Sequence, residues 1–181
     1  MKKEIMVAGF GGQGVMSIGK LLVEAGVKED MDVSWVPSYG PEMRGGTANC
    51  SVILSDKPIG SPLVYNPSEL IAMNEPSLAK FENDVVPSGS IFINSTIIKE
   101  AVERSDVQVY SVPCDSIALD LGNIKAANMV MLGAFVAATD SLKMSTLQSM
   151  VQHMFTGSKE KLAVLNMKAL ERGALCINKT T

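Results

Sequence analysis

Residues 5–15 read IMVAGFGGQGV, a short apolar run that passes directly into a cluster of glycines. An apolar run of this length is typical of a buried strand, here residues 5–8. Residues 15–28 then repeat apolar side chains at helical spacing, which predicts a helix packed on a sheet. A strand, a glycine turn and a helix in this order open a βαβ unit, with residues 33–36 as the expected second strand.

The rest of the chain continues the alternation and then becomes helical. Further strands are predicted at residues 47–54, 70–73, 90–93 and 107–112, and helices at 75–82, 97–104, 115–121, 126–139, 145–154 and 158–173, the last ending at Gly173. The apolar stretch 126–138 is too short to cross a bilayer and is expected to be a buried helix. The pattern predicts a single domain, residues 1–181, of the α/β class. Its expected fold is a Rossmann-like open, mostly parallel sheet with helices on both faces and a helical C-terminal part.

Composition excludes several classes of function. The chain has 16 Lys and Arg against 19 Asp and Glu, and a net charge of -3 argues against nucleic acid as a partner. The three cysteines, Cys50, Cys114 and Cys176, are far apart in the sequence. This spacing argues against a disulfide framework, a zinc site or a self-contained iron–sulfur cluster. With no signal-peptide pattern at the N-terminus, we expect a cytoplasmic protein that has no membrane partner.

The glycine loop is the first candidate site. Gly9, Gly11 and Gly14 fit the pattern G-x-G-x-x-G between a predicted strand and a predicted helix. Glycines allow a tight turn and a close approach to the backbone, and the helix N-terminus offers N–H groups to an anion. Gly11, Gly12, Gln13 and Gly14 are therefore the expected backbone donors to a phosphate or carboxylate. The alternative is that the glycines serve only close packing of the helix on the sheet.

A dinucleotide site of the Rossmann type also needs an acidic residue at the end of the second strand, for the ribose hydroxyls. Residues 35–38 read WVPS, and no Asp or Glu stands there. The sequence therefore disfavours a free-standing NAD site despite the glycine pattern.

The second candidate site is the segment 38–46, SYGPEMRGG, which is too rich in Gly and Pro for regular structure. Arg44 offers a planar fork of donors for a carboxylate or phosphate, Glu42 could orient it, and Tyr39 could give a hydrogen bond or a stacking face. The segment follows the second strand, so we expect it at the carboxyl edge of the sheet, beside the glycine loop. The alternative is a surface loop with a local Glu–Arg pair.

Three other residues are weaker candidates. His153 is the only histidine and lies on an amphipathic helix, so it is interpreted as a surface or packing residue, and no Ser–His–Asp triad is available. Asn128 interrupts the apolar helix, and two readings stay open: a cap or hydrogen bond within the fold, or a side chain that points at the site. Cys114 is interpreted as a buried, inert thiol, although its place at a strand end could bring it to the same edge.

These motifs together resemble a known family. Residues 9–15 (GFGGQGV), 37–46 (PSYGPEMRGG) and 128–134 (NMVMLGA) are similar, in this order, to the gamma subunit of 2-oxoacid:ferredoxin oxidoreductases. The similarity extends over nearly the whole chain, which makes it more specific than the glycine pattern alone.

The resemblance implies a subunit of an enzyme that oxidatively decarboxylates a 2-oxoacid with coenzyme A, giving an acyl-CoA, carbon dioxide and reduced ferredoxin. It implies that thiamine diphosphate, magnesium and iron–sulfur clusters are held by alpha, beta and ferredoxin-like subunits, while the gamma subunit serves the coenzyme A side and assembly. The form of the two loops is closer to that of members acting on 2-oxoglutarate or branched 2-oxoacids than to that of pyruvate enzymes, and 2-oxoglutarate is the expected substrate.

On this reading the chain carries no catalytic residue and no metal, and alone it is inactive. The expected binding residues lie in two loops and contact either coenzyme A or a partner subunit: Gly9, Gly11, Gly12, Gln13 and Gly14 in the first, and Tyr39, Glu42 and Arg44 in the second. The Met-rich apolar helices predict that the isolated chain self-associates as a homo-oligomer. Two competing hypotheses are a free-standing Rossmann-type nucleotide-binding enzyme and a scaffold whose glycine loop serves packing alone.

Overall fold

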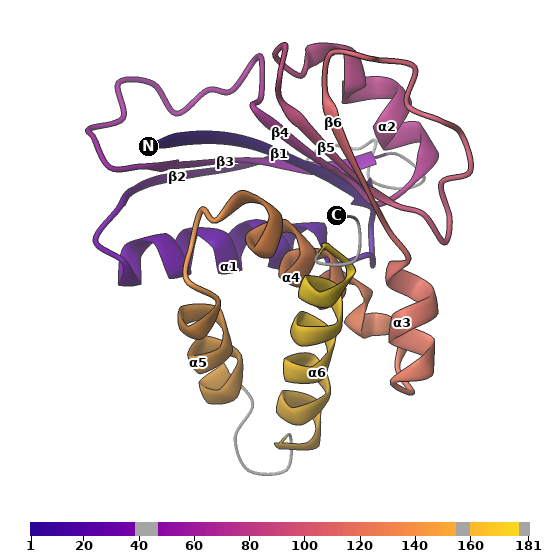
Figure 1. Ribbon diagram of the computed structural model, residues 1–181. Helices are drawn as coiled ribbons and strands as arrows, with labels where there is room; N and C mark the ends of the chain where they lie inside the picture. The colour runs from indigo at the N-terminus through magenta and orange to yellow at the C-terminus, as the bar shows by residue number, and fades with distance from the viewer. Residues whose placement is uncertain (39–46, 155–159, 178–181) are drawn as a thin grey trace.

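One sheet forms the frame of the molecule in the computed structural model, which describes residues 1–38, 47–154 and 160–177 (Figure 1). The strand order in the described residues is β2-β3-β1-β4-β5-β6. The strands are β1 (Lys2–Phe10), β2 (Asp32–Ser38), β3 (Thr47–Ser55), β4 (Glu69–Ala72), β5 (Ser90–Asn94) and β6 (Gln108–Val112). Only β3 runs against the others, so the sheet is mostly parallel, as predicted.

The place of β3 is the feature that the sequence did not reveal. The glycine turn suggested that β1 and β2 are neighbours, but β3 lies between them and pairs antiparallel with both. In this register Thr47 pairs with Phe10, and Asn49 pairs with Ser38. The strands that flank residues 39–46 therefore reach the edge at which β1 ends.

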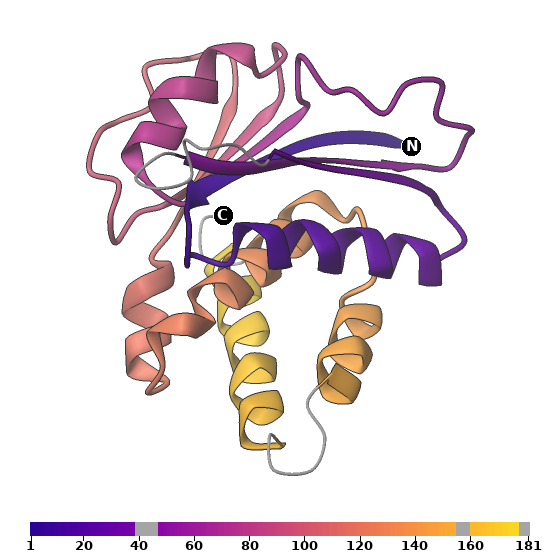
Figure 2. The same ribbon diagram turned by 180° about the vertical axis from the view of Figure 1, so that it is seen from behind.

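Helices lie on both faces of the sheet, but unequally. Figures 1 and 2 show α1, α4, α5 and α6 below the sheet and α2 above it. The helices are α1 (Val15–Lys28), α2 (Glu75–Phe81), α3 (Cys114–Asp120), α4 (Ala127–Thr139), α5 (Met144–Met154) and α6 (Glu160–Ile177), with short 3₁₀ turns η2 (Glu82–Asp84) and η3 (Ile124–Ala126). This is the predicted fold class, with its helical C-terminal part.

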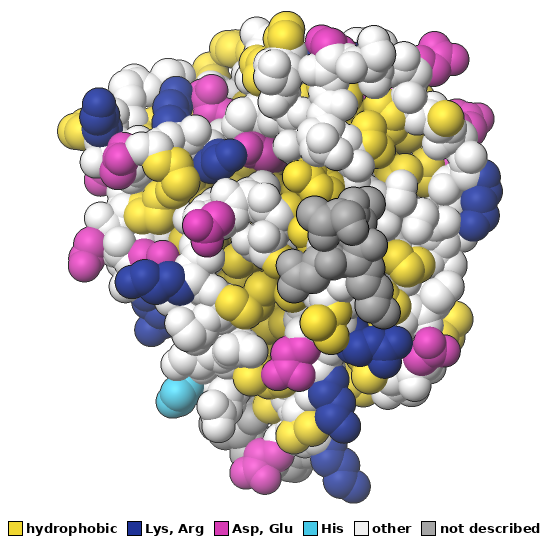
Figure 3. All heavy atoms as spheres, in the orientation of Figure 1, with side chains coloured by type: hydrophobic (Ala, Val, Ile, Leu, Met, Phe, Trp, Pro, Cys, Tyr) yellow, Lys and Arg dark blue, Asp and Glu magenta, His cyan; other side chains and the backbone are white. Residues whose placement is uncertain are grey.

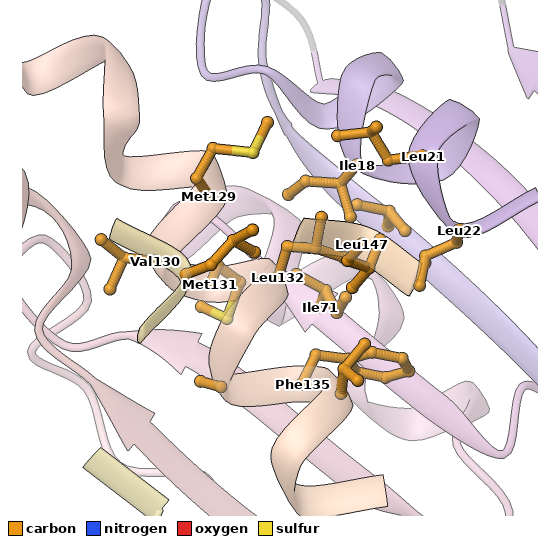
Figure 4. Packing of buried hydrophobic residues seen from close by; sticks show 14 of the residues in the cluster. Ile18, Leu21, Leu22, Ile71, Met129, Val130, Met131, Leu132, Phe135 and Leu147 are labelled. Carbon is orange, nitrogen blue, oxygen red and sulfur yellow. The ribbon is translucent and has the colours of Figure 1, made fainter. Parts of the chain in front are cut away.

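Helix α4 is the centre of the larger core. Met131, Leu132 and Phe135 are fully buried, and Ile18 of α1 and Leu147 of α5 belong to the same cluster (Figure 4). A helix that is apolar on all sides is stable only when other elements surround it, as α4 is here. The predicted buried helix is thus confirmed. Neither α4 nor any other helix in the described ranges is long and apolar enough to cross a membrane.

Two glycines bring α4 and α6 into close contact. A Cβ placed on Gly133 would lie 2.0 Å from the Leu170 carbonyl oxygen, and one on Gly173 would lie 1.9 Å from the Val130 carbonyl oxygen. The prediction that the last helix ends at Gly173 is therefore wrong, because α6 continues to Ile177. Gly173 is needed for close packing within the helix and not for its end.

The prediction of a helix at residues 97–104 is also wrong, since this segment forms turns and irregular structure. Its residues are held by tertiary hydrogen bonds: the Arg104 guanidinium pairs with Asp106 and donates to the Glu82 carbonyl oxygen at 3.0 Å. A stretch of eight residues has little helical stability of its own, and these contacts outweigh it. The other predicted strands and helices are present with small shifts at their ends, and the predicted start at Ser158 lies outside the described residues.

Candidate functional site

The glycine loop is fixed to the neighbouring strand by one side chain. Oε1 of Gln13 accepts from the Phe10 N–H at 2.7 Å and from Nδ2 of Asn74 at 3.1 Å, while its Nε2 donates to the Met73 carbonyl oxygen at 3.0 Å. Asn74 is buried, and its Oδ1 caps α2 by accepting from the Ser77 N–H at 2.9 Å. Gln13 therefore positions the loop against the carboxyl ends of β1 and β4.

The positions of this loop are occupied by glycine for different reasons. A Cβ on Gly9 would meet Val15 at 2.8 Å, and one on Gly14 would meet Nδ2 of Asn128 at 2.4 Å, so packing requires both. Gly12 has a φ of +96°, which disfavours other residues. A Cβ on Gly11 would meet nothing within 4 Å, so neither packing nor a positive φ explains this glycine.

The loop leaves backbone donors open next to the N-terminus of α1. The Gln13 N–H is used within the loop, donating to the Phe10 carbonyl oxygen at 3.2 Å. In the part of the chain that the structure describes, the N–H groups of Gly11 and Gly12 have no hydrogen-bond partner. Two open amides beside the positive end of a helix dipole favour an anion.

Asn128 lies against this loop. Its side chain contacts Gly14, and the residue is only 8% exposed. Its amide forms no hydrogen bond with any of the described residues. The polar atoms of this amide are not fully buried but reach the surface at a hollow beside the loop, where they are open to water or to a group from outside. Of the two open readings of Asn128, the structure thus favours the one in which the side chain belongs to the site.

A small hollow lies between Gly12 and Gln13 of the loop and the side chain of Asn128. It measures about 110 Å³ and is lined by Gly12, Gln13, Asn128, Lys125 and Asp115, among others. Lys125 forms no ion pair within residues 1–38, 47–154 and 160–177, whereas Oδ1 of Asp115 accepts from the Asn94 amide at 2.9 Å. We call this space the edge hollow.

A larger groove of about 380 Å³ continues from the edge hollow along α1, and Lys125 and Asn128 line both spaces. Figure 2 shows α1 in front, with α5 and α6 descending behind it. We call this space the α1–α6 groove. Sequence reasoning did not identify it, because its lining comes from helices that are distant in the chain.

Tyr39, Glu42 and Arg44 of the second predicted loop lie outside the described residues. Sequence reasoning missed Lys125, Asp115 and the loop contact of Asn74. A signal was present for two of them: Asn74 and Asp115 each follow a strand end by a few residues, and parallel strands bring such residues to one edge.

The remaining candidates take no part in this site. His153 is exposed, and its Nδ1 lies 2.6 Å from the Ser149 carbonyl oxygen. Cys114 is buried, and burial raises the pKa of its thiol well above the ordinary value, which confirms the inert-thiol reading. Among the described residues, no group of three or more His, Cys, Asp or Glu side chains could hold a metal ion.

Comparison with known proteins identifies the family. Residues 4–176 match the family model described as pyruvate ferredoxin/flavodoxin oxidoreductase. The chain belongs to this family. Ketoisovalerate oxidoreductase subunit VorA of Methanothermobacter thermautotrophicus is 41% identical over 94% of this chain, but this chain spans only 35% of that protein. The 2-oxoglutarate synthase subunit KorC of Methanocaldococcus jannaschii is 30% identical and is matched over 92% of its length.

Solved structures agree with this membership. The gamma subunit of a keto/oxoacid ferredoxin oxidoreductase from Geobacter sulfurreducens is 26% identical, with a TM-score of 0.85 over 98% of this chain and 99% of that one. A 2-oxoglutarate:ferredoxin oxidoreductase from Magnetococcus marinus, with 2-oxoglutarate, coenzyme A and succinyl-CoA bound, shares the fold at a TM-score of 0.91 and 22% identity. This chain covers 32% of that protein.

Proposed function

We propose that this chain is the gamma subunit of a 2-oxoacid:ferredoxin oxidoreductase and that its glycine loop binds a phosphate group of coenzyme A. The single observation that carries the proposal is the pair of open N–H groups at Gly11 and Gly12, beside the unpartnered amide of Asn128. Lys125 supplies a cation at the same hollow. Together these groups supply backbone donors, a side-chain donor and a positive charge, as phosphate binding requires.

The chemistry of the oxidation is assigned to other subunits. Thiamine diphosphate, magnesium and iron–sulfur clusters would be held there, and this chain would bind the charged end of coenzyme A while the thiol reaches the neighbouring subunit. On this proposal the complex works in the cytoplasm, and the isolated chain has no oxidoreductase activity. The relatives are named for ketoisovalerate, 2-oxoglutarate and pyruvate. The proposal therefore takes the 2-oxoacid class as substrate, and 2-oxoglutarate stays a prediction to be tested by comparing the three acids.

The sheet order argues against the alternative of a free-standing NAD enzyme. A Rossmann ribose site needs an acidic residue at the end of the strand next to β1. Here β3 occupies that place, and β2 lies two strands away from β1, which is about 10 Å at ordinary strand spacing. β2 also ends at Ser38 without an acid.

The surface supports an assembly. Figure 3 shows hydrophobic side chains over much of the middle of one face. Exposed apolar residues include Leu119 of α3 and Val164 of α6. We propose that partner subunits cover such residues in the complex, and that the chain alone forms a homo-oligomer. Light scattering of the isolated chain tests this, and a clean monomer at micromolar concentration would contradict it.

The loop itself is tested with Gly11→Leu in the assembled complex. The new side chain would stand in open space beside the N–H groups, so it blocks a phosphate without a clash inside the chain. We expect the dissociation constant of coenzyme A to rise at least about tenfold, the loss of one charge-assisted contact. Gly60→Leu is the matched control, because a Cβ on Gly60 also meets nothing within 4 Å but lies far from the loop in the sequence. Equal affinities for the two variants would overturn the proposal.

A further inference from the structure

The outward side of α6 carries a row of exposed side chains that the proposed loop site does not use. Five residues are spaced by three or four positions, which places them on one side of a helix: Lys161, Val164, Lys168, Arg172 and Leu175. All five are exposed, with 56% exposure at Val164 and 52% at Leu175. We call this row, which is about 21 Å long at the rise of an α-helix, the α6 stripe.

The inner side of α6 explains how the helix is held. Leu170 and Gly173 are buried, and Gly173 lies against the backbone of α4. Because this inner side already fixes the helix, packing within the chain gives no reason for apolar side chains at Val164 and Leu175. In the shared orientation of Figures 1 and 3, Lys and Arg side chains gather over the lower part of α6, with hydrophobic side chains beside them.

The three cations of the stripe are not neutralised by their own chain. The side chains of Lys161, Lys168 and Arg172 form no ion pair or hydrogen bond with any of the described residues. Glu171, the only Asp or Glu between residues 161 and 177, borders the stripe. The stripe is therefore positive, although the whole chain has a net charge of -3. A surface of one sign favours a partner surface of the opposite sign.

A protein surface fits this stripe better than a membrane does. Helices that lie on membranes bury a wide apolar face in the lipid, whereas the apolar side of α6 packs on α4 and the stripe has only Val164 and Leu175. Arginine beside apolar side chains is typical of protein interfaces. Further protein is also joined to this fold in one relative, since the chain matches only 35% of the VorA subunit.

We propose that the α6 stripe docks an acidic surface of a partner subunit, whose Asp and Glu side chains pair with Lys161, Lys168 and Arg172. Val164 and Leu175 pack against apolar atoms of the same partner. This inference rests on the proposed function, since it takes the chain to be a subunit of a complex. Charge pairs of this kind orient the partner and speed association, and salt screens them.

The test measures the dissociation constant of this chain from the remaining subunits by sedimentation velocity, at low and at high salt. We expect Lys168→Glu combined with Arg172→Glu to raise this constant at least about tenfold at low salt and less at high salt. Lys57→Glu combined with Lys143→Glu is the matched control, because it reverses two exposed charges on other segments, and it should leave the constant unchanged. Urea unfolding of both double variants verifies that each is folded.

A carbodiimide, which joins amines to carboxylates in contact, identifies what covers the stripe. We expect mass spectrometry of the cross-linked complex to find Lys161 and Lys168 joined to Asp or Glu residues of another subunit. Cross-links to a second copy of this chain would overturn the inference. Binding of the chain to phosphatidylserine vesicles that the Lys168→Glu, Arg172→Glu variant loses would overturn it in favour of a membrane.

The outcomes separate this inference from the proposed function. If the complex assembles and the two double variants bind the remaining subunits equally well, the assignment of the α6 stripe is overturned and the proposed function stands. If the wild-type chain does not assemble with the other subunits at all, the proposed function fails, and this inference fails with it.

Discussion

The glycines between α4 and α6 and Gly11 in the loop after β1 have opposite relations to their surroundings. A Cβ on Gly133 or Gly173 would lie about 2 Å from backbone of the facing helix, whereas one on Gly11 would meet nothing. Packing inside the chain explains the first pair completely. Packing does not explain Gly11, where the open space leaves room for a group from outside. The same glycine-rich composition thus serves stability in one place and, on the proposed function, binding in the other.

The largest expected effect is on stability, at a glycine between α4 and α6. Gly173→Ala forces α4 and α6 apart, because the new methyl group would overlap the Val130 carbonyl. We expect a loss of about 3 kcal/mol or more in the free energy of unfolding, at the upper end of the range for overpacking. Urea unfolding measures it. Glu171→Ala, an exposed site on the same helix, is the control, and equal stability of both variants would break the comparison.

A pH-dependent effect is expected at another packing glycine. Gly19 leaves room for the thiol of Cys50, and burial raises the pKa of that thiol from 9.0 to about 11. The folded state therefore binds the Cys50 proton more tightly than the unfolded state does. Its contribution of about 2–3 kcal/mol is fully present below pH 9 and is lost between about pH 9 and pH 11.

Urea unfolding at pH 8, 9, 10 and 11 follows this change in the wild type and in Cys50→Ala. The variant should lose less stability over the interval. Cys114 is also buried with a raised pKa, so part of the decline should remain. Parallel curves for the two proteins would show that Cys50 is not the titrating group.

A smaller effect is expected on the affinity for coenzyme A at the edge hollow. Asp115 places a carboxylate in the edge hollow, where it repels a phosphate. Asp115→Asn keeps an oxygen for the Asn94 amide and removes the charge, so affinity for coenzyme A in the complex should rise about threefold to tenfold. Asp120→Asn on the exposed end of the same helix should change nothing. Weaker binding of coenzyme A by the Asp115→Asn variant would contradict this prediction, because it would mean that the carboxylate contacts the ligand directly.

The sequence was sufficient for the fold wherever a local pattern decides the structure. The strand at residues 5–8, the turn after it and the buried helix around Met131 follow from apolar runs and glycines, which act over a few residues. The insertion of β3 between β1 and β2 was not predictable, because strand pairing depends on contacts between distant residues. For the same reason the continuation of α6 past Gly173 required knowledge of α4.

The candidate site was predictable in part. The glycine pattern located the loop, and the polar residue within an apolar helix drew attention to Asn128. Lys125 and the α1–α6 groove could not be found, since they exist only after α1, α4 and α6 have packed together. The pattern also gave no way to separate Gly11 from Gly9 and Gly14, a distinction that depends on which atoms a Cβ would meet.

The most direct test follows the amide resonances of the glycines in the ¹⁵N-labelled chain during titration with coenzyme A. The resonances of N–H groups that donate to a phosphate oxygen shift, whereas those of glycines away from the loop do not. We expect Gly11 and Gly12 to shift strongly and Gly60 and Gly173 to stay in place. Unmoved Gly11 and Gly12 signals, at a ligand concentration that moves resonances elsewhere in the chain, would contradict the account.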